Sequence, residues 1–131
     1  MNDFKTINHE LTINATPAQV YQALLSSEQH SAFTGAPAVI DATQGGEFSN
    51  FNGAITGTIE ELQENKLIRM KWRASAFPEN YYTDVVFKLE KNENGTTIKF
   101  SHQGLPAEAE PMINEGWESN YWQKLPAYLE S

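Results

Sequence analysis

The sequence has no cysteine, few basic residues and no long apolar run. Without cysteine there is no disulfide, thiolate zinc site or cysteine nucleophile, as is common in reducing compartments. Seventeen acidic residues against nine basic ones give a net charge of -8, which repels nucleic acid. No stretch approaches the roughly 20 apolar residues that cross a bilayer, and residues 1–5 do not resemble a secretory leader. We therefore expect no nucleic-acid partner, no membrane insertion and a cytoplasmic location.

The composition that is present is that of an ordinary globular protein. The chain has 131 residues, of which 40% are apolar and 20% charged. This length suits one domain, and the apolar content is sufficient for a core. We predict a single domain over residues 1–131.

The first third of the sequence predicts one strand followed by two short helices. Residues 4–14 alternate between apolar and polar, and His9 falls on the apolar face. Thr16 and Gln19 have the spacing of a capping box, which begins a helix. Ser26 offers a second cap, for a short helix that ends near Gly35.

The middle of the sequence predicts an antiparallel meander. Asn52-Gly53, residues 64–66 and Asn94-Gly95 are typical of hairpin turns. Between these turns the apolar alternation predicts strands near Glu47–Ser49, Ala54–Leu62, Leu67–Arg73, Tyr81–Lys91 and Thr96–Gln103.

From about Glu108 the apolar positions follow helical spacing, and we expect Pro126 to kink this helix or to end it near Leu125. The resulting α+β fold is a curved antiparallel sheet around a long C-terminal helix. One helix does not fill such a sheet, so we expect an apolar hollow of several hundred Å³ between them. The predicted cavity residues are His9, Trp72, Tyr81, Phe87, His102, Trp117 and Tyr121.

These cavity residues have a second interpretation. An isolated histidine on an apolar face is usually a core residue whose nitrogens are satisfied by neighbours, and the aromatic residues are mostly core. The three histidines lie far apart in the sequence, and neither a metal-binding motif nor a nucleophile motif occurs. We predict no catalytic residue, no metal site and no cofactor.

A basic strip is unusual in so acidic a chain. Basic residues occupy the outer face of one predicted strand, and an aromatic residue follows in the next loop. The predicted partner surface consists of Arg69, Lys71, Arg73 and Phe77. Alternatively, the basic residues pair across strands with Asp84 and Glu60.

Six short motifs follow in order: Phe33–Ala38, Gly45–Phe48, Gly53–Gly57, Lys71–Arg73 with Phe77-Pro78, Gly104–Pro106, and Gly116-Trp117. Over about residues 33–125 they resemble the C-terminal domain of the activator of the heat shock protein 90 ATPase. The N-terminal strand and helix pair fit the wider START-like, birch-allergen-like superfamily. The resemblance implies a helix-grip fold.

The resemblance also implies three classes of function. Two-domain activators engage the chaperone's middle region through an N-terminal domain, whereas this chain opens on the first strand of the sheet. The wider superfamily binds lipids, polyketides and other apolar molecules, and we therefore expect a non-enzymatic binding module that holds a small apolar or amphipathic ligand between sheet and helix. The alternatives are a co-chaperone-like contact with a chaperone, and a cyclase- or hydrolase-like enzyme that uses a cavity histidine as base. The oligomeric state is left open.

Overall fold

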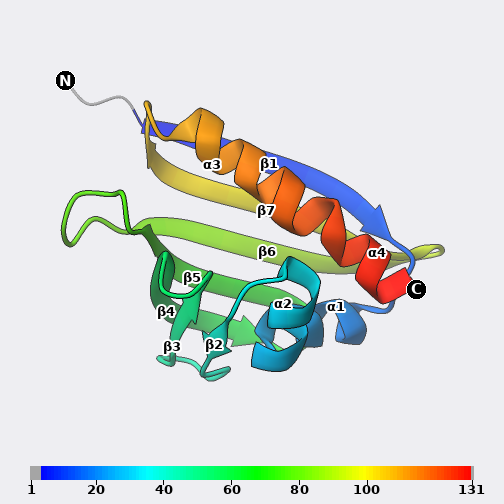
Figure 1. Cartoon of the computed structure of the whole chain (residues 1–131). Helices are drawn as coiled ribbons and strands as arrows, with labels where there is room; N and C mark the ends of the chain where they lie inside the picture. Colours follow the sequence, from blue (N-terminus) through cyan, green and yellow to red (C-terminus); the bar gives the residue numbers. More distant parts are fainter. Residues whose placement is uncertain (1–3, 131) are drawn as a thin grey trace.

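The computed structural model describes residues 4–130, so residues 1–3 and 131 of the predicted domain lie outside the described residues. The predicted α+β helix-grip fold is confirmed (Figure 1). Its elements are β1 (Phe4–Ile13), α1 (Pro17–Leu25), α2 (Ser27–Thr34), β2 (Val39–Ile40), β3 (Glu47–Asn50), β4 (Ile55–Gln63), β5 (Leu67–Ala74), β6 (Thr83–Asn92), β7 (Gly95–Pro106), α3 (Glu110–Trp117), the π-helical turn η1 (Glu118–Trp122) and α4 (Lys124–Glu130).

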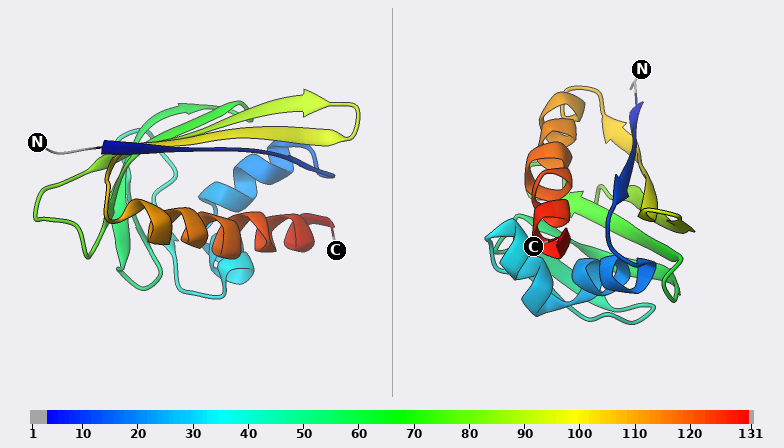
Figure 2. Two further views of the ribbon diagram at one scale, coloured as in Figure 1. Left: turned by 90° about the horizontal axis from the view of Figure 1, so that it is seen from above. Right: turned by 90° about the vertical axis from the view of Figure 1, so that its right-hand side faces the viewer.

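The sheet is an antiparallel meander closed by its first strand. Its order is β1-β7-β6-β5-β4-β3-β2. The C-terminal segment, α3 to α4, lies along one face of the curved sheet, and α1 and α2 pack at one end (Figure 2). Two details differ from the prediction: β2 is only two residues long, too short for a periodic signal, and β7 continues past Gln103 to Pro106.

The N-terminal helices begin where the capping residues predict. The backbone N–H of Thr16 donates to Gln19 Oε1 at 2.8 Å, and that of Gln19 donates to Thr16 Oγ1 at 3.1 Å. Ser26 caps α2, and Gly35 ends it in the left-handed conformation, with φ of 80°. These caps hold α2 where its residue His30 is buried against the C-terminal segment.

The C-terminal segment changes its pitch before Pro126, not at it. In η1 the N–H of Gln123 donates to Glu118 O at 3.0 Å, the wider spacing of a π turn. Pro126 then falls in the first turn of α4, where a missing N–H is tolerated. The predicted interruption before a short final segment is therefore present, but it falls at Gln123 and not near Leu125, because the π turn has already shifted the hydrogen-bond ladder.

The core lies between the sheet and the helices. Fully buried apolar side chains come from the central strands and from both termini of the fold, among them Ile13, Val20, Ile59, Ile68, Val85, Ile98, Leu105 and Leu125. Between residues 4 and 130, none of the helices has the length and apolar character needed to traverse a lipid bilayer.

Candidate functional site

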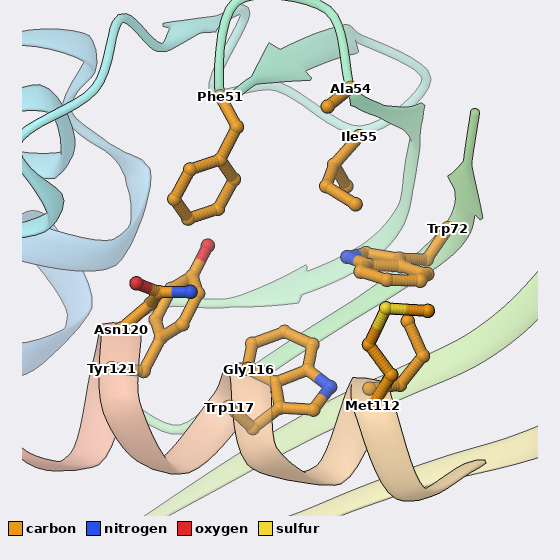
Figure 3. Close-up of a pocket in the computed structure, with 10 residues that line it drawn as sticks. Phe51, Ala54, Ile55, Trp72, Met112, Gly116, Trp117, Asn120 and Tyr121 are labelled. Carbon is orange, nitrogen blue, oxygen red and sulfur yellow. The ribbon is translucent and has the colours of Figure 1, made fainter. Parts of the chain in front are cut away.

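A pocket of about 200 Å³ lies between the C-terminal segment and the hairpin that joins β3 to β4 (Figure 3). It is smaller than the several hundred Å³ expected from the sequence, because Trp117 and Tyr121 fill much of the space between helix and sheet. The lining side chains are Phe51, Ala54, Ile55, Trp72, Met112, Ile113, Trp117, Asn120 and Tyr121, with Gly116 between them. None of these residues is charged.

The roof of the pocket is set by a tight turn. Phe51 and Asn52 both have positive φ, of 53° and 55°, and Gly53 follows with 92°. This turn places Phe51 and Ile55 above the helix, on the side that Tyr121 faces (Figure 3). The Phe51 and Tyr121 rings meet edge to face, with centroids 6.2 Å apart.

The floor of the pocket is one face of the C-terminal segment. Met112, Gly116 and Asn120 recur at four-residue spacing, as residues on one helical face do. A Cβ atom at Gly116 would meet only Asn120 Nδ2, at 3.9 Å, so no clash requires a glycine there. Glycine inside a helix costs about 1 kcal/mol relative to alanine, and here it leaves space open to the pocket.

His102 lies behind the pocket and is fully buried. Trp117 Nε1–H donates to its Nδ1 at 3.0 Å, so the ring hydrogen is on Nε2 and donates to Thr83 Oγ1 at 2.7 Å. The Thr83 hydroxyl donates in turn to Trp72 O at 2.9 Å. Burial lowers the pKa of His102 to about 3, so the ring is neutral. Since both nitrogens are engaged, neither is free to act as the base that the enzyme hypothesis requires.

His9 has a similar arrangement further along the helix. Trp122 Nε1–H donates to its Nδ1 at 2.8 Å, and Nε2–H donates to Asn114 Oδ1 at 2.8 Å. His9 stacks on Phe100 and is not among the residues that line the pocket. The two histidines assigned to the hollow therefore fasten the helix to β1 and β7.

The third histidine completes the pattern. Tyr121 OH lies 2.8 Å from Nε2 of His30, on α2. Burial lowers the pKa of His30 to about 4 and raises that of Tyr121. Trp117, Tyr121 and Trp122, here called the aromatic anchor, thus bond to all three histidines of the chain.

The π turn explains how two residues of the aromatic anchor, Trp117 and Trp122, reach His102 and His9 on the sheet. In a regular α-helix, residues five apart point about 140° away from each other. A π turn brings residues i and i+5 toward the same side. Trp117 and Trp122 accordingly stack, with ring centroids 6.2 Å apart and planes inclined by 20°. Both indoles can then face the sheet.

Of the remaining residues predicted to line the cavity, some line the pocket and others do not. Trp72, Trp117 and Tyr121 line the pocket. Phe87 lies deeper, against Trp117. Tyr81 does not line the pocket, and its hydroxyl donates to Gly104 O at 2.6 Å. Sequence reasoning did not assign Phe51, Ile55, Met112 and Asn120 to the site.

The predicted partner surface is reduced to two residues. Phe77 is buried against Trp72, so the prediction that it is exposed was wrong. Phe77 lies in a loop, where strand alternation does not indicate which side chains are buried. Arg73 is half-buried, and its guanidinium donates to the carbonyl oxygens of Phe77 and Pro78 at 2.9 and 3.3 Å. Arg69 and Lys71 remain exposed.

The two exposed residues face acidic neighbours across the sheet. Lys71 is in register with Asp84 on β6, as the alternative interpretation predicts. Arg69 is in register with Glu61 on β4, where Glu60 was expected, because a register shift falls between Ile59 and Glu61. The basic strip is thus smaller and more nearly neutral than the sequence alone indicates.

Comparison with known proteins identifies the family. The family described as Activator of Hsp90 ATPase homolog 1-like protein matches residues 14–130, nearly the whole chain. The chain belongs to this family. Curated relatives of this member include Activator of 90 kDa heat shock protein ATPase homolog 1 from Mus musculus, 30% identical over 87% of the chain and 34% of the relative. The Homo sapiens protein of that name has the same identity and coverage. The chain thus spans about a third of these relatives.

Solved structures of the same fold cover nearly the full chain. An HSP90 activator from Plasmodium falciparum matches with a TM-score of 0.86 and 24% identity, over 97% of this family member and 96% of that chain. The Aha1 dimer from Colwellia psychrerythraea, solved in solution, has a TM-score of 0.83 and 26% identity, over 96% of each chain. Such likeness confirms the fold of the domain.

Proposed function

We propose that this family member is a binding module that holds a small apolar or amphipathic ligand in the pocket under the β3–β4 hairpin. The observation that supports this most directly is the construction of the pocket. Aromatic rings from three parts of the chain form its walls, and Gly116 leaves open a place that any other residue would partly fill. Aromatic walls with few polar groups are typical of small-molecule sites.

The pocket also limits the class of ligand. Its volume of about 200 Å³ suits a molecule of about one aromatic ring with a short substituent, smaller than the usual drug-sized ligand. Because an unpaired buried charge is costly, an uncharged lining selects against a carboxylate or ammonium inside. Asn120, half-buried on the helix, supplies an amide at the wall.

Filling the pocket from its floor tests this function. Gly116→Leu is expected to weaken the binding of small substituted benzenes at least tenfold, because the new side chain would occupy ligand space. Gly116→Ala, the matched control, is expected to bind within about threefold of the parent and to be stabilised by up to about 1 kcal/mol. The measurement is tryptophan fluorescence during ligand titration, since Trp72 and Trp117 line the pocket.

The same titration can refute the proposal. A broad panel of neutral aromatic and amphipathic compounds that changes neither the fluorescence nor the melting temperature would count against a ligand site. So would unchanged binding in a folded Gly116→Leu variant.

A second candidate function is contact with a 90 kDa heat shock protein in the cytoplasm. It is favoured by the curated relatives, which are named as activators of that ATPase, and by the exposed pair Arg69 and Lys71. Two cations on one strand face would suit an acidic patch on the chaperone.

Charge reversal tests this contact. The double variant Arg69→Glu/Lys71→Glu is expected to weaken binding to a purified 90 kDa heat shock protein at least tenfold at low salt, where charge contacts are strongest. Lys66→Glu/Lys91→Glu changes the net charge equally at other exposed sites and should leave binding unchanged. Isothermal titration calorimetry measures both. Equal loss in the two variants would indicate a general effect of net charge, and no binding by the parent would remove this candidate.

A further inference from the structure

A second, smaller cavity lies behind the pocket. Its volume is about 20 Å³, enough for one water-sized group. Trp72, Trp117 and Tyr121 line both spaces, so the pocket and the cavity adjoin at these side chains. The other lining residues come from α1, α2, β2, β3, β5 and β6: Leu24, Leu25, His30, Ile40, Phe48, Asn50, Met70 and Phe87.

Two buried polar atoms belong to residues of this cavity. His30 Nδ1 and Asn50 Oδ1 have no hydrogen-bond partner among residues 4–130. The two residues are only 3% and 5% exposed. Native proteins pair nearly all buried polar atoms, so two unpaired ones at a single small cavity indicate a site for a polar group.

The hydrogen-bond pattern defines which group fits. If Tyr121 OH donates to His30 Nε2, only the Nδ1–H of that ring lacks a partner. In the other tautomer, the hydroxyl hydrogen of Tyr121, a residue that is only 5% exposed, would also lack an acceptor among residues 4–130. The first arrangement leaves fewer groups unpaired. The cavity then offers one donor, from His30, and one acceptor, Asn50 Oδ1.

A hydroxyl oxygen complements such a pair, because it accepts one hydrogen bond and donates another. A carboxylate could not donate to Asn50, and an ammonium could not accept from His30. No lining residue carries a charge that would compensate for either ion. Tyr121 itself shows that a phenol oxygen fits beside the His30 ring.

We propose that this cavity is a hydroxyl-binding subsite, so that the preferred ligand is a small neutral phenol or alcohol whose apolar body lies in the aromatic pocket and whose hydroxyl binds between His30 and Asn50. The inference rests on the proposed ligand-binding function and specifies its substrate class. Trp72, Trp117 and Tyr121, which border both spaces, contact the ligand along its length. The hydroxyl fixes its orientation.

Matched ligands and matched variants test the subsite. The probes are 4-propylphenol and 4-propyltoluene, which differ only in a hydroxyl and a methyl group of similar size. The parent protein is expected to bind the phenol at least tenfold more tightly, because the methyl group would leave both polar atoms unpaired. In Asn50→Leu, and in His30→Gln, the preference is expected to fall below threefold. His30→Gln keeps an acceptor for Tyr121 while removing the Nδ1 donor.

Stability separates a binding role from a structural one. Asn50→Leu replaces a buried amide whose oxygen is unpaired by an apolar group of similar size, so its melting temperature should equal or exceed that of the parent. A folded Asn50→Leu protein that has lost the phenol preference supports the subsite. A large fall in melting temperature would instead show that Asn50 serves the fold, and would overturn the inference.

The outcomes distinguish the two proposals. If both probes bind equally to the parent and Gly116→Leu weakens both, the ligand pocket stands and the hydroxyl subsite is refuted. If neither probe binds at concentrations up to their solubility, both proposals fail for this ligand class. Retention of the phenol preference in Asn50→Leu and in His30→Gln would also refute the subsite.

Discussion

Trp117→Ala is expected to lower the free energy of unfolding by about 4 kcal/mol, the usual loss when a large buried aromatic side chain is removed. Trp117 is 3% exposed and packs against Phe100 and Tyr121, with ring centroids 4.5 and 4.6 Å away. The substitution would leave a cavity between the helix and the sheet and would remove the indole donor to His102. Urea unfolding at pH 7, followed by far-UV circular dichroism, measures the loss.

Two companion variants separate packing from hydrogen bonding. Trp117→Phe keeps an aromatic ring but leaves His102 Nδ1 unpaired, and should cost about 1–3 kcal/mol beyond the lost contact area. Met112→Ala, at a residue of α3 that is 67% exposed, should stay within about 0.5 kcal/mol of the parent. If Trp117→Phe were as stable as Met112→Ala, the bond to His102 would contribute nothing to stability.

The strands and helices of this fold could be predicted where the sequence has a local pattern, such as apolar alternation or a helix cap. The alternation of Ile68, Met70 and Trp72 identifies a strand with one buried face, and β5 buries those residues. The capping box at Thr16 and Gln19 likewise depends only on neighbours in sequence. These signals suffice for a meander and its helices, because most strand neighbours are also sequence neighbours.

The π turn was beyond such reasoning. The turn is defined by the hydrogen bond from Gln123 N–H to Glu118 O. The spacing of apolar residues in the sequence does not distinguish this bond from the i to i−4 bond of a regular α-helix. The signal that was visible, Pro126, predicts a disturbance of the helix but not that the preceding turn absorbs it. What favours the wide turn is tertiary: it lets Trp117 and Trp122 both reach histidines on the sheet.

The candidate site was only half predictable for a similar reason. Helical spacing places Trp117 and Tyr121 on the buried face, and both line the pocket. Phe51 reaches the pocket from a hairpin turn, where neither strand nor helix periodicity applies. His30 on α2 and Asn50 on β3 are distant in sequence, and only the tertiary fold brings both to one cavity.

The C-terminal segment has two roles: it is held in place by the aromatic anchor, and it lines the pocket. The indole N–H groups of Trp117 and Trp122 are directed at histidines of β1 and β7, which holds the segment in place. Gly116 and Asn120 contribute small or polar groups on the side of the β3–β4 hairpin, where the pocket lies. A helix fixed along one side can leave room on the other without losing its position, which a preorganised binding site requires.

Acid is expected to destabilise the protein strongly below pH 6.5. Burial lowers the pKa of His30 to about 4 and that of His102 to about 3, from 6.5. Below pH 6.5 the unfolded chain therefore binds protons that the folded chain excludes. The stability that both neutral rings provide is complete above pH 6.5 and is lost as the pH falls toward 4 and then 3. At pH 4.5, two units below the unfolded value, the two histidines together account for a loss of about 5 kcal/mol.

This loss is comparable with the whole stability of a small domain, about 5–15 kcal/mol, so the protein should be close to unfolding at pH 4.5. Urea unfolding at pH 7 and pH 4.5 measures the effect, and His30→Gln isolates one contribution, since glutamine does not titrate and carboxylate effects common to both proteins cancel. The variant should lose about 2–3 kcal/mol less than the parent between these pH values. An identical pH dependence in both proteins would mean that His30 is charged in the folded state, contrary to its burial beside Tyr121.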